Sequence, residues 1–188
     1  MTAPTTENTG NYTIDVAHSR VGFVARHAMV TKVRGSFNDF TGTGFFDADD
    51  PSKSHLELVI QANSVDTRNE DRDNHLRSND FFDMETYPTI EFRSTSVEGD
   101  GSGGYNVTGD LTMKGVTKSV SIDFTFEGAA KDPFGQDKIG FEGSTTVNRK
   151  DWGIEWNAPL EAGGVLVSEK VTLEFEVAAI ATDGDAAS

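Results

Sequence analysis

The sequence predicts an all-β protein: one antiparallel, eight-stranded β-barrel with a single short α-helix inserted between its two groups of strands. Most of the chain alternates apolar and polar residues, the pattern of strands that bury one face, and turn residues separate the alternating segments. One stretch, residues 69–88, lacks this alternation and carries the signals of a helix. Strands with one polar face each must stack as a sandwich or close on themselves, and about eight strands close a barrel just wide enough for side chains or one small ligand.

Four strands are expected before the helix. They span residues 12–15, 20–27, 33–46 and 56–60. The third is long, and three glycines interrupt its pattern: Gly35, Gly42 and Gly44. We expect these glycines to mark bends or bulges, because barrels use glycine at such places.

The helix is predicted to begin after Asn69. The Asn69 side chain can cap a first turn that carries Glu70 and Asp71, where the helix macrodipole favours negative charge. The apolar side of this stretch consists of Leu76, Phe81, Phe82 and Met84. Pro88 forces the residue before it into an extended conformation, which ends the helical run. A helix of barely three turns is unstable alone in water, so we expect it to lie across one mouth of the barrel.

The second half is expected to be a run of antiparallel hairpins. Its strands span residues 89–97, 105–113, 118–129, 139–147 and 171–177. Between two of them, Asp132-Pro133-Phe134-Gly135 matches a type I turn, with Asp first, Pro second and Gly fourth. The 188 residues predict one domain over residues 11–181, with disordered tails at residues 1–10 and 182–188.

The charge and amino-acid composition exclude several classes of binding partner and site. The formal net charge of -15 would repel phosphate backbones, which excludes nucleic acid, and it also disfavours docking on an anionic membrane surface. No apolar run approaches the ~18 residues of a membrane span, so no stable membrane insertion is expected. The chain has no cysteine, which removes disulfides, thiolate metal sites and cysteine nucleophiles. The first residues lack the basic and apolar regions of a secretory signal, which predicts a cytoplasmic protein.

Five motifs follow one another along the chain. They are Asp15-x-x-His18-Ser19; Val33-Arg34-Gly35-x-Phe37; Arg72-Asp73-x-His75-Leu76-Arg77-Ser78-x-Asp80-Phe81-Phe82-Asp83 with Tyr87-Pro88-x-Ile90-x-Phe92; Gly109-x-Leu111-Thr112-x-Lys114-Gly115-Val116-Thr117; and Asn148-Arg149-x-Asp151-Trp152-Gly153. In this order they resemble the signature of the YceI-like family of polyisoprenoid-binding, lipocalin-like β-barrel proteins. The resemblance runs from about Tyr12 to Ile180.

This resemblance implies a lipocalin-like barrel and a ligand class. The ligand would be a long isoprenoid chain, such as the tail of an isoprenoid quinone, held for storage or transport. Many members of the family are exported, a pattern from which the N-terminal residues of this chain depart. Relatives also pair as dimers, which leaves a homodimer open.

Small and polar residues on the inward side of the strands favour a hollow barrel. They are Ser94, Ser96, Gly109, Gly143 and Thr145. A filled core would use bulkier groups at these positions. The alternative is that several of them mark bulges or strand ends. The residues expected to contact the ligand are Phe23, His27, Phe37, Leu58, Ile60, Phe81, Phe92, Leu111, Phe124, Phe126, Phe141, Thr145, Trp152 and Phe175.

Two residue types leave alternatives open. His27 shares the parity of Val21 and Phe23, so it would point inward and either bind a polar ligand head or bond a partner within the interior. Trp152 and Trp156 would either fill the core or contact lipid at the barrel entrance.

The sequence contains no recognisable catalytic constellation. The four histidines have no metal-binding spacing, Ser19 lacks the nucleophile-elbow motif, and the charged residues Arg72, Asp73, Asp80 and Asp83 fit a solvated helix face. We therefore expect a binding protein with no catalytic residue, no metal and no required cofactor. Its partner would be a hydrophobic small molecule, an isoprenoid lipid or quinone. Two alternatives remain: an enzyme acting on a lipophilic substrate in the same cavity, and a stress-related protein that binds fatty acids or amides.

Overall fold

A computed structural model of the chain describes residues 3–161 and 163–182. The described strands are β1 (Gly10–Ile14), β2 (Arg20–His27), β3 (Thr31–Phe37), β4 (Phe40–Phe46), β5 (His55–Gln61), β6 (Val65–Asp66), β7 (Thr89–Gly99), β8 (Gly104–Met113), β9 (Val116–Lys131), β10 (Asp137–Asn148) and β11 (Lys170–Ala181). The described α-helix is α1 (Glu70–Arg77), and short 3-10 turns occur at η1 (Thr6–Asn8), η2 (Val16–His18), η3 (Pro51–Lys53), η4 (Ala62–Ser64) and η5 (Arg149–Trp152).

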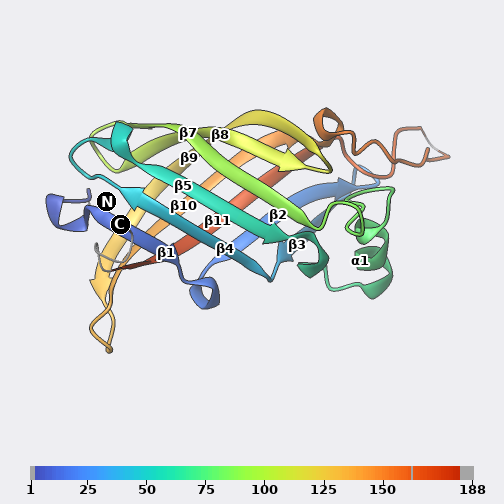
Figure 1. Cartoon of the computed structure of the whole chain (residues 1–188). Coiled ribbons are helices and arrows are strands. Elements are labelled where there is room, and N and C mark those ends of the chain that lie inside the picture. Colours follow the sequence, from blue (N-terminus) through green and yellow to red (C-terminus); the bar gives the residue numbers. More distant parts are fainter. Residues whose placement is uncertain (1–2, 162, 183–188) are drawn as a thin grey trace.

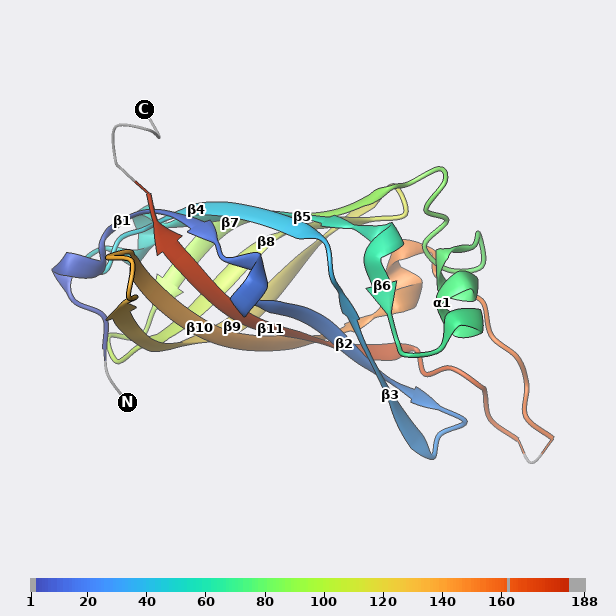
Figure 2. The same cartoon turned by 90° about the horizontal axis from the view of Figure 1, so that it is seen from below.

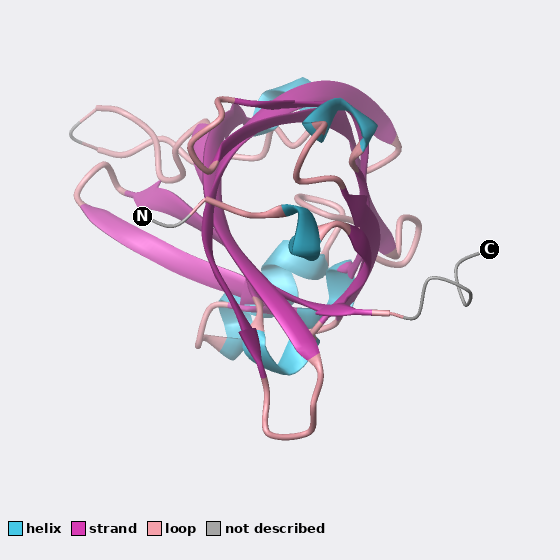
Figure 3. Ribbon diagram, turned by 90° about the vertical axis from the view of Figure 1, so that its left-hand side faces the viewer, coloured by secondary structure: helices cyan, strands magenta, loops and turns pink. Residues whose placement is uncertain are grey.

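Eight strands close into an antiparallel barrel, which confirms the predicted fold class. The order around the ring is β1, β4, β5, β7, β8, β9, β10, β11, and β11 pairs again with β1. Figure 3 looks along this ring from one end. The alternation of each strand places its apolar residues in the interior, where they form one continuous core.

Strand β11 is shared between two neighbours. Its C-terminal part, Ala179 to Ala181, pairs with β1, whereas its earlier part, Thr172 to Glu176, pairs with β2. After β1 the chain passes through η2 into β2, and both strands pair with β11. Beyond this point β2 and β3 continue as a hairpin that leaves the barrel (Figure 2).

The two ends of the barrel carry different elements. One end, here called the helix end, carries α1, the tip of the β2–β3 hairpin and the segment between η5 and β11 (Figure 1). The other end, here called the turn end, carries η1 and the β9–β10 turn at residues 132–135 (Figure 1). Among the described residues, no helix is long and apolar enough to cross a membrane.

The helix begins where the sequence predicts, but it is shorter. The Arg72 backbone N–H donates to Asn69 Oδ1 at 3.0 Å, which confirms the N-cap. The helix ends at Arg77, and the Ser78 hydroxyl donates to the His75 carbonyl. The apolar residues Phe81 to Met84 therefore lie in turns after the helix rather than on it. Strand β7 begins at Thr89, directly after Pro88, as predicted.

The predicted long third strand is two strands. The break lies at Asn38 and Asp39, and the strand pairing continues without a register shift through Gly35, Gly42 and Gly44. The expectation that these glycines mark bulges is therefore wrong. They allow close approach instead, as the rings and backbone that lie against them show.

The predicted N-terminal tail overlaps ordered structure. Turn η1 lies within it, and the Thr6 hydroxyl donates to Asp49 Oδ1 at 2.9 Å. Of the predicted C-terminal tail only Thr182 is described, and its N–H donates to the Asn11 carbonyl; residues 183–188 lie outside the described residues.

Candidate functional site

Two apolar cavities lie inside the barrel, one toward each end. The turn-end cavity measures about 120 Å³ and is lined by residues that include Tyr12, Phe46 and Tyr105. The helix-end cavity measures about 130 Å³, and its lining includes Phe23 and Phe81. An apolar cavity of about 150 Å³ holds benzene, so each of these has room for roughly one prenyl unit.

A pair of aromatic rings stands between the cavities. Phe124 lines the turn-end cavity and Phe175 lines the helix-end cavity, and their ring centroids are 5.9 Å apart. Because each ring contributes to a different wall and the two rings contact each other, this pair forms part of the partition. A chain longer than one prenyl unit must displace these rings to occupy both cavities.

Glycines allow several rings to lie along the barrel wall. A Cβ atom on Gly35, Gly109 or Gly143 would overlap the ring of Phe23, Phe92 or Phe124, respectively. Gly35 is directly paired with Phe23, and Gly143 with Phe124. Cross-strand pairs point to the same face of a sheet, so each of these rings turns sideways over its glycine. Gly109 and Gly143 therefore do not mark empty space themselves; they hold rings against the wall. The inward position predicted for Ser96 is wrong: Ser96 is exposed, and the strand register shifts between Ser94 and Ser96, as the bulge alternative predicts.

Aromatic residues from distant parts of the chain cover the helix-end cavity. His75 in α1 stacks edge-on against Phe81 and against Trp156, with ring centroids 5.0 and 4.5 Å away. Leu76 and Phe82 complete this wall, and Phe82 packs on Phe37. The helix is held in place by Asp73, a buried carboxylate that accepts a hydrogen bond from the Thr67 N–H at 2.8 Å. Asp73 is therefore not part of a solvated face, contrary to the prediction.

Arg149 supplies the charged group of the helix-end cavity lining. Its side chain is only 5 % exposed, and burial lowers the pKa of its guanidinium. The guanidinium donates to three backbone carbonyls: those of Ser168 at 2.8 Å, Ile154 at 2.8 Å and Val167 at 3.3 Å. Among the described residues, no carboxylate forms an ion pair with it, since the nearby Glu169 pairs with Lys150 at 2.9 Å.

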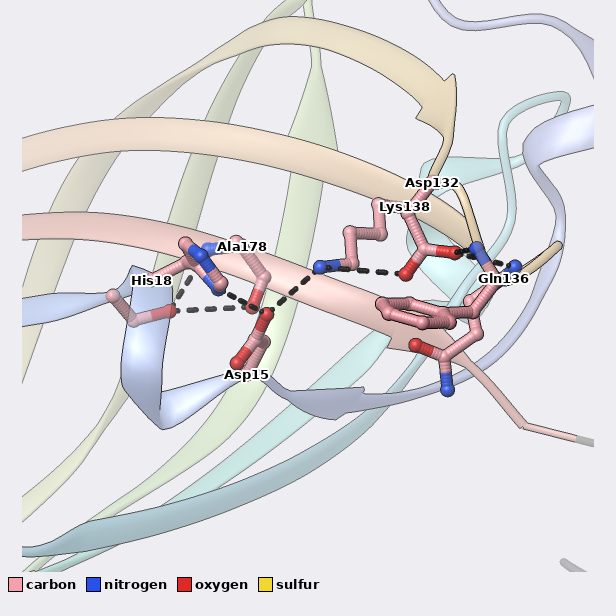
Figure 4. Close-up of polar contacts among 8 residues, drawn as sticks. Asp15, His18, Asp132, Gln136, Lys138 and Ala178 are labelled. Carbon is pink, nitrogen blue, oxygen red and sulfur yellow. Dashed lines mark hydrogen bonds and ion pairs between the residues drawn. The ribbon is translucent and has the colours of Figure 1, made fainter.

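At the turn end a cation is held by carboxylates instead (Figure 4). Lys138 Nζ lies 3.0 Å from Asp15 Oδ2 and 3.7 Å from Asp132 Oδ2. His18 Nδ1 lies 2.8 Å from the same Asp15 oxygen. The Lys138 ammonium, and then the His18 ring, hold the pKa of Asp15 below its usual value, and Asp15 in turn raises the pKa of Lys138. This network fixes η2 to the β9–β10 turn.

Ten of the fourteen residues predicted to contact the ligand line a cavity. Eight line the helix-end cavity: Phe23, Phe37, Leu58, Ile60, Phe81, Phe92, Leu111 and Phe175. Two line the turn-end cavity: Phe124 and Phe141. Whether they contact a ligand stays a prediction.

Four predicted residues line neither cavity. Phe126 is buried against Phe141, with ring centroids 5.5 Å apart. Trp152 is buried and its indole N–H donates to the Leu111 carbonyl at 2.9 Å, which matches the core alternative rather than lipid contact. Thr145 is half-buried on the parity of Val147, which does line the helix-end cavity.

The inward orientation predicted for His27 is wrong. His27 does share the parity of Phe23, but the strand has already left the barrel at this point, and His27 is exposed. It forms a β-bridge with Val167 instead. Alternation gives the side of a strand on which a residue lies, but it does not show where the strand leaves the sheet's core.

The predicted ligand contacts omit Arg149, the charged residue of the helix-end cavity lining, along with several of its apolar residues such as Leu76 and Phe82. The motif of Arg149, Asn148-Arg149-x-Asp151-Trp152-Gly153, predicts only a loop at the barrel mouth. An arginine inside a motif next to a core tryptophan is a signal of burial, since the tryptophan fixes the neighbouring backbone to the core. Among the described residues, no group of three or more His, Asp or Glu side chains is arranged to hold a metal ion.

Comparisons with known proteins agree with this architecture. The family model described as YceI-like domain matches residues 12–179. A UPF0312 protein of Shewanella denitrificans is 42% identical over 175 residues, which cover 92% of this chain and 90% of that protein.

Two solved structures show the same fold. The Campylobacter jejuni YceI protein has a TM-score of 0.73 and 30% identity, covering 84% of this chain and 90% of its own. A polyisoprenoid binding domain from Saccharophagus degradans has a TM-score of 0.68 at 17% identity, covering 91% of this chain and 98% of its own. With the family match over nearly the whole barrel, the chain belongs to the YceI-like domain family.

Proposed function

We propose that this protein binds a long, apolar isoprenoid-type lipid in the barrel interior, for storage or transport. The observation that carries the proposal is the pair of apolar cavities, one toward each end of the barrel, divided by the side chains of Phe124 and Phe175. Burying each methylene is worth ~0.8 kcal/mol, so a chain that fills both cavities would be held strongly without any charged contact. Membership of the family, and the name of the Saccharophagus degradans neighbour, support the same ligand class.

The helix-end cavity is the better candidate for the polar end of the ligand. Arg149 donates three hydrogen bonds to backbone carbonyls, and no described carboxylate lies within ion-pair distance of it, since Glu169 pairs with Lys150 and acts on Arg149 only at longer range. A buried charge of this kind favours an electron-rich oxygen nearby, such as a quinone carbonyl. The chain of the ligand would then extend past Phe175 toward the turn end.

Binding is favoured over catalysis by the composition of the cavity walls. Their lining is almost entirely hydrocarbon, and the charged member, Arg149, is a guanidinium, which does not lose its proton and so cannot act as a general base. His27, on which an enzyme mechanism in this cavity would depend, lies outside both cavities.

A quinone series tests the proposal. Delipidated protein is titrated with quinones that share one head group and carry none, one, two or more prenyl units, and tryptophan fluorescence is read because Trp156 lies at the helix-end wall. We expect affinity to rise with each added unit until both cavities are filled. The Trp156→Phe variant identifies the reporting residue, and mass spectrometry of organic extracts identifies the lipid that copurifies. Absence of any copurifying lipid, together with no uptake of any quinone, contradicts the proposal.

The cytoplasmic location and the homodimer stay predictions. Cell fractionation tests the first, and analytical ultracentrifugation of purified protein tests the second.

A further inference from the structure

The tip of the β2–β3 hairpin projects from the helix end (Figure 2). Its inner side is continuous with the helix-end cavity, because Phe23 and Ala25 of β2 line that cavity and the tip follows directly. The loop before β11 lies against the tip: the Ala28 N–H donates to the Leu166 carbonyl at 2.7 Å, and the Met29 sulfur lies beside Gly164.

Exposed apolar side chains gather at this tip. Met29 is 65% exposed and Val30 is 77% exposed, and Val165 on the adjoining loop is 39% exposed. These are three of the five large hydrophobic side chains that the described structure exposes. Ala28 and Met29 both have positive φ, a backbone conformation in which glycine or asparagine is the usual choice. The turn thus presents a methionine to solvent at a position that local backbone preference does not favour.

Cations surround the apolar tip. Residues 24–34 contain Arg26, Lys32 and Arg34 but no Asp or Glu, although the whole chain has a net charge of -15. All three side chains are exposed, and among the described residues none has a carboxylate within ion-pair distance. The adjoining segment between η5 and β11 contains three carboxylates, Glu155, Glu161 and Glu169, and Glu169 is paired with Lys150.

The three cations lie on the same face of the hairpin. Arg26 is directly paired with Lys32 across the two strands, and Arg34 follows Lys32 at the next position on that face. Like charges that face each other across a strand pair destabilise the sheet. An anionic surface that covers this face would relieve the repulsion.

We propose that the hairpin tip, defined as Arg26 to Arg34, docks on the surface of an anionic lipid bilayer and brings the helix-end cavity against the source of its lipid. The inference rests on the proposed lipid-binding function. Apolar side chains inserted at the headgroup level, flanked by cations that contact anionic headgroups, are the elements of reversible membrane association. The acidic remainder of the molecule, which includes the exposed Glu70 and Asp71 of α1 at the same end, is repelled, so the projecting tip is the part that approaches the bilayer.

A second copy of the chain fits this surface less well. Two hairpin tips that paired would bring six cations together. Lys32 and Arg34 lie on the part of β3 whose outer edge is unpaired, since β6 pairs only with Ser36 and Phe37, and cations on a free edge oppose strand addition. Edge protection alone does not explain Arg26, which is on the inner strand of the hairpin, or the exposed Met29.

Vesicle flotation tests the docking surface. The full chain is mixed with vesicles of phosphatidylcholine alone, or of phosphatidylcholine and phosphatidylglycerol in equal parts, and the bound fraction is measured at low and high salt. We expect binding only to the anionic vesicles, and less binding at high salt. M29S/V30S should weaken binding by on the order of tenfold or more. R26Q/K32Q should weaken it by about 25-fold, at roughly fivefold for each cation.

Phe134 provides a matched control. It is 89% exposed on the β9–β10 turn at the opposite end of the barrel, so Phe134→Ser removes an equally exposed apolar side chain without touching the tip. We expect wild-type binding for this variant. All variants change exposed side chains, and thermal melts verify that each remains folded.

Three results would overturn the docking surface. The first is that the wild-type protein does not bind anionic vesicles, and the second is that F134S and M29S/V30S lose vesicle binding equally. The third is that M29S/V30S changes from dimer to monomer while its vesicle binding stays intact, which would assign the tip to a second copy. Uptake of a prenylated quinone from detergent micelles is measured in parallel. Normal uptake without vesicle binding refutes the docking surface alone, whereas vesicle binding without uptake refutes the lipid-binding function alone.

Discussion

The two ends of the barrel each hold a partly or fully buried cation, and they do so by opposite means. At the helix end, Arg149 donates to three backbone carbonyls and keeps its charge without a paired carboxylate. At the turn end, Lys138 lies between Asp15 and Asp132, so its charge is neutralised. The helix-end cavity therefore has a guanidinium in its lining, whereas the Lys138 ammonium does not line the turn-end cavity.

The same contrast extends to how each end is built. The helix end is assembled from α1, the β2–β3 hairpin and the loop before β11, which are far apart in the sequence and cover the cavity with side chains. The turn end carries short connections and an ion network. We expect ligand entry at the helix end, because side chains of separate segments, rather than paired strands, cover the cavity there.

The largest effect on stability is expected when a buried aromatic ring is removed from the cavity lining at one end of the barrel or the other. Phe81→Ser and Phe46→Ser both remove a buried ring that lines a cavity, and each should lower the free energy of unfolding by ~3–5 kcal/mol. Only Phe81→Ser should also speed the release of a bound quinone, because Phe81 lies at the mouth. Release is measured by stopped-flow displacement at a temperature at which both variants are folded. Equal release rates in the two variants would remove the assignment of the entrance.

The next largest effect is the difference in stability and quinone affinity between variants of Arg149 and Lys138. Arg149→Met removes the guanidinium donor from the Ser168 and Ile154 carbonyls, whereas the Val167 carbonyl still accepts from Asn157 Nδ2 at 2.7 Å. Each carbonyl left unpaired costs ~1–3 kcal/mol, so we expect a loss of about 2 kcal/mol or more in urea unfolding. Lys138→Met should cost less, because Asp15 keeps the His18 ring and Asp132 keeps the Phe134 and Gln136 N–H groups as hydrogen-bond partners. Quinone affinity should fall in Arg149→Met and stay unchanged in Lys138→Met. A normal affinity in folded Arg149→Met would limit this residue to anchoring the loop.

The sequence alone predicts the strands and the helix of the barrel, but it does not predict how the side chains are arranged inside it. Alternation, turn residues and the single helical stretch predict the strands and α1, since these depend on local patterns that the fold obeys. The same alternation placed His27 inside, because a pattern of period two continues unchanged when a hairpin leaves the barrel. Nothing local to residues 20–27 marks that departure.

The inward small residues show a second limit. In the sequence, Gly109 and Gly143 indicate a hollow interior. Cavities are present, but rings of the neighbouring strand occupy the space at these two glycines. Which ring turns toward which glycine depends on strand register, which only the structure supplies. The burial of Arg149 is unpredictable for the same reason, because it depends on the folded arrangement of distant segments. The carbonyls that accept its hydrogen bonds belong to residues up to nineteen positions away.

Those glycines allow each cavity to be narrowed separately. Gly35→Ala would push Phe23 off the wall into the helix-end cavity, and Gly143→Ala would push Phe124 into the turn-end cavity. Overpacking of this kind should lower stability by ~1–3 kcal/mol in each variant. A ligand with one prenyl unit should lose affinity only in Gly35→Ala, whereas a long-chain ligand should lose affinity in both. If Gly143→Ala left long-chain binding unchanged, the ligand would not reach the turn end.

The smallest effect is a difference in how the two ends respond to pH. The Lys138 ammonium lowers the pKa of Asp15 in the folded protein, so ionised Asp15 stabilises the fold. This contribution is fully present above the ordinary Asp pKa of about 3.9, and it is lost as the pH falls through the lower pKa of the folded state. Asp15→Asn should therefore be less stable than wild type in urea at neutral pH, and the difference should shrink as the pH falls below about 4.

Arg149 gives the matched comparison for that experiment. Its partners are carbonyls, which do not titrate, and a guanidinium stays protonated throughout the acid range even though burial lowers its pKa. The stability difference between Arg149→Met and wild type should therefore stay nearly constant over the same pH series. A constant difference for Asp15→Asn would show that Asp15 acts through packing or neutral hydrogen bonds rather than through its charge. A strongly pH-dependent difference for Arg149→Met would show that a carboxylate, such as Glu169, compensates the guanidinium in solution, and the contrast between the two ends would then be lost.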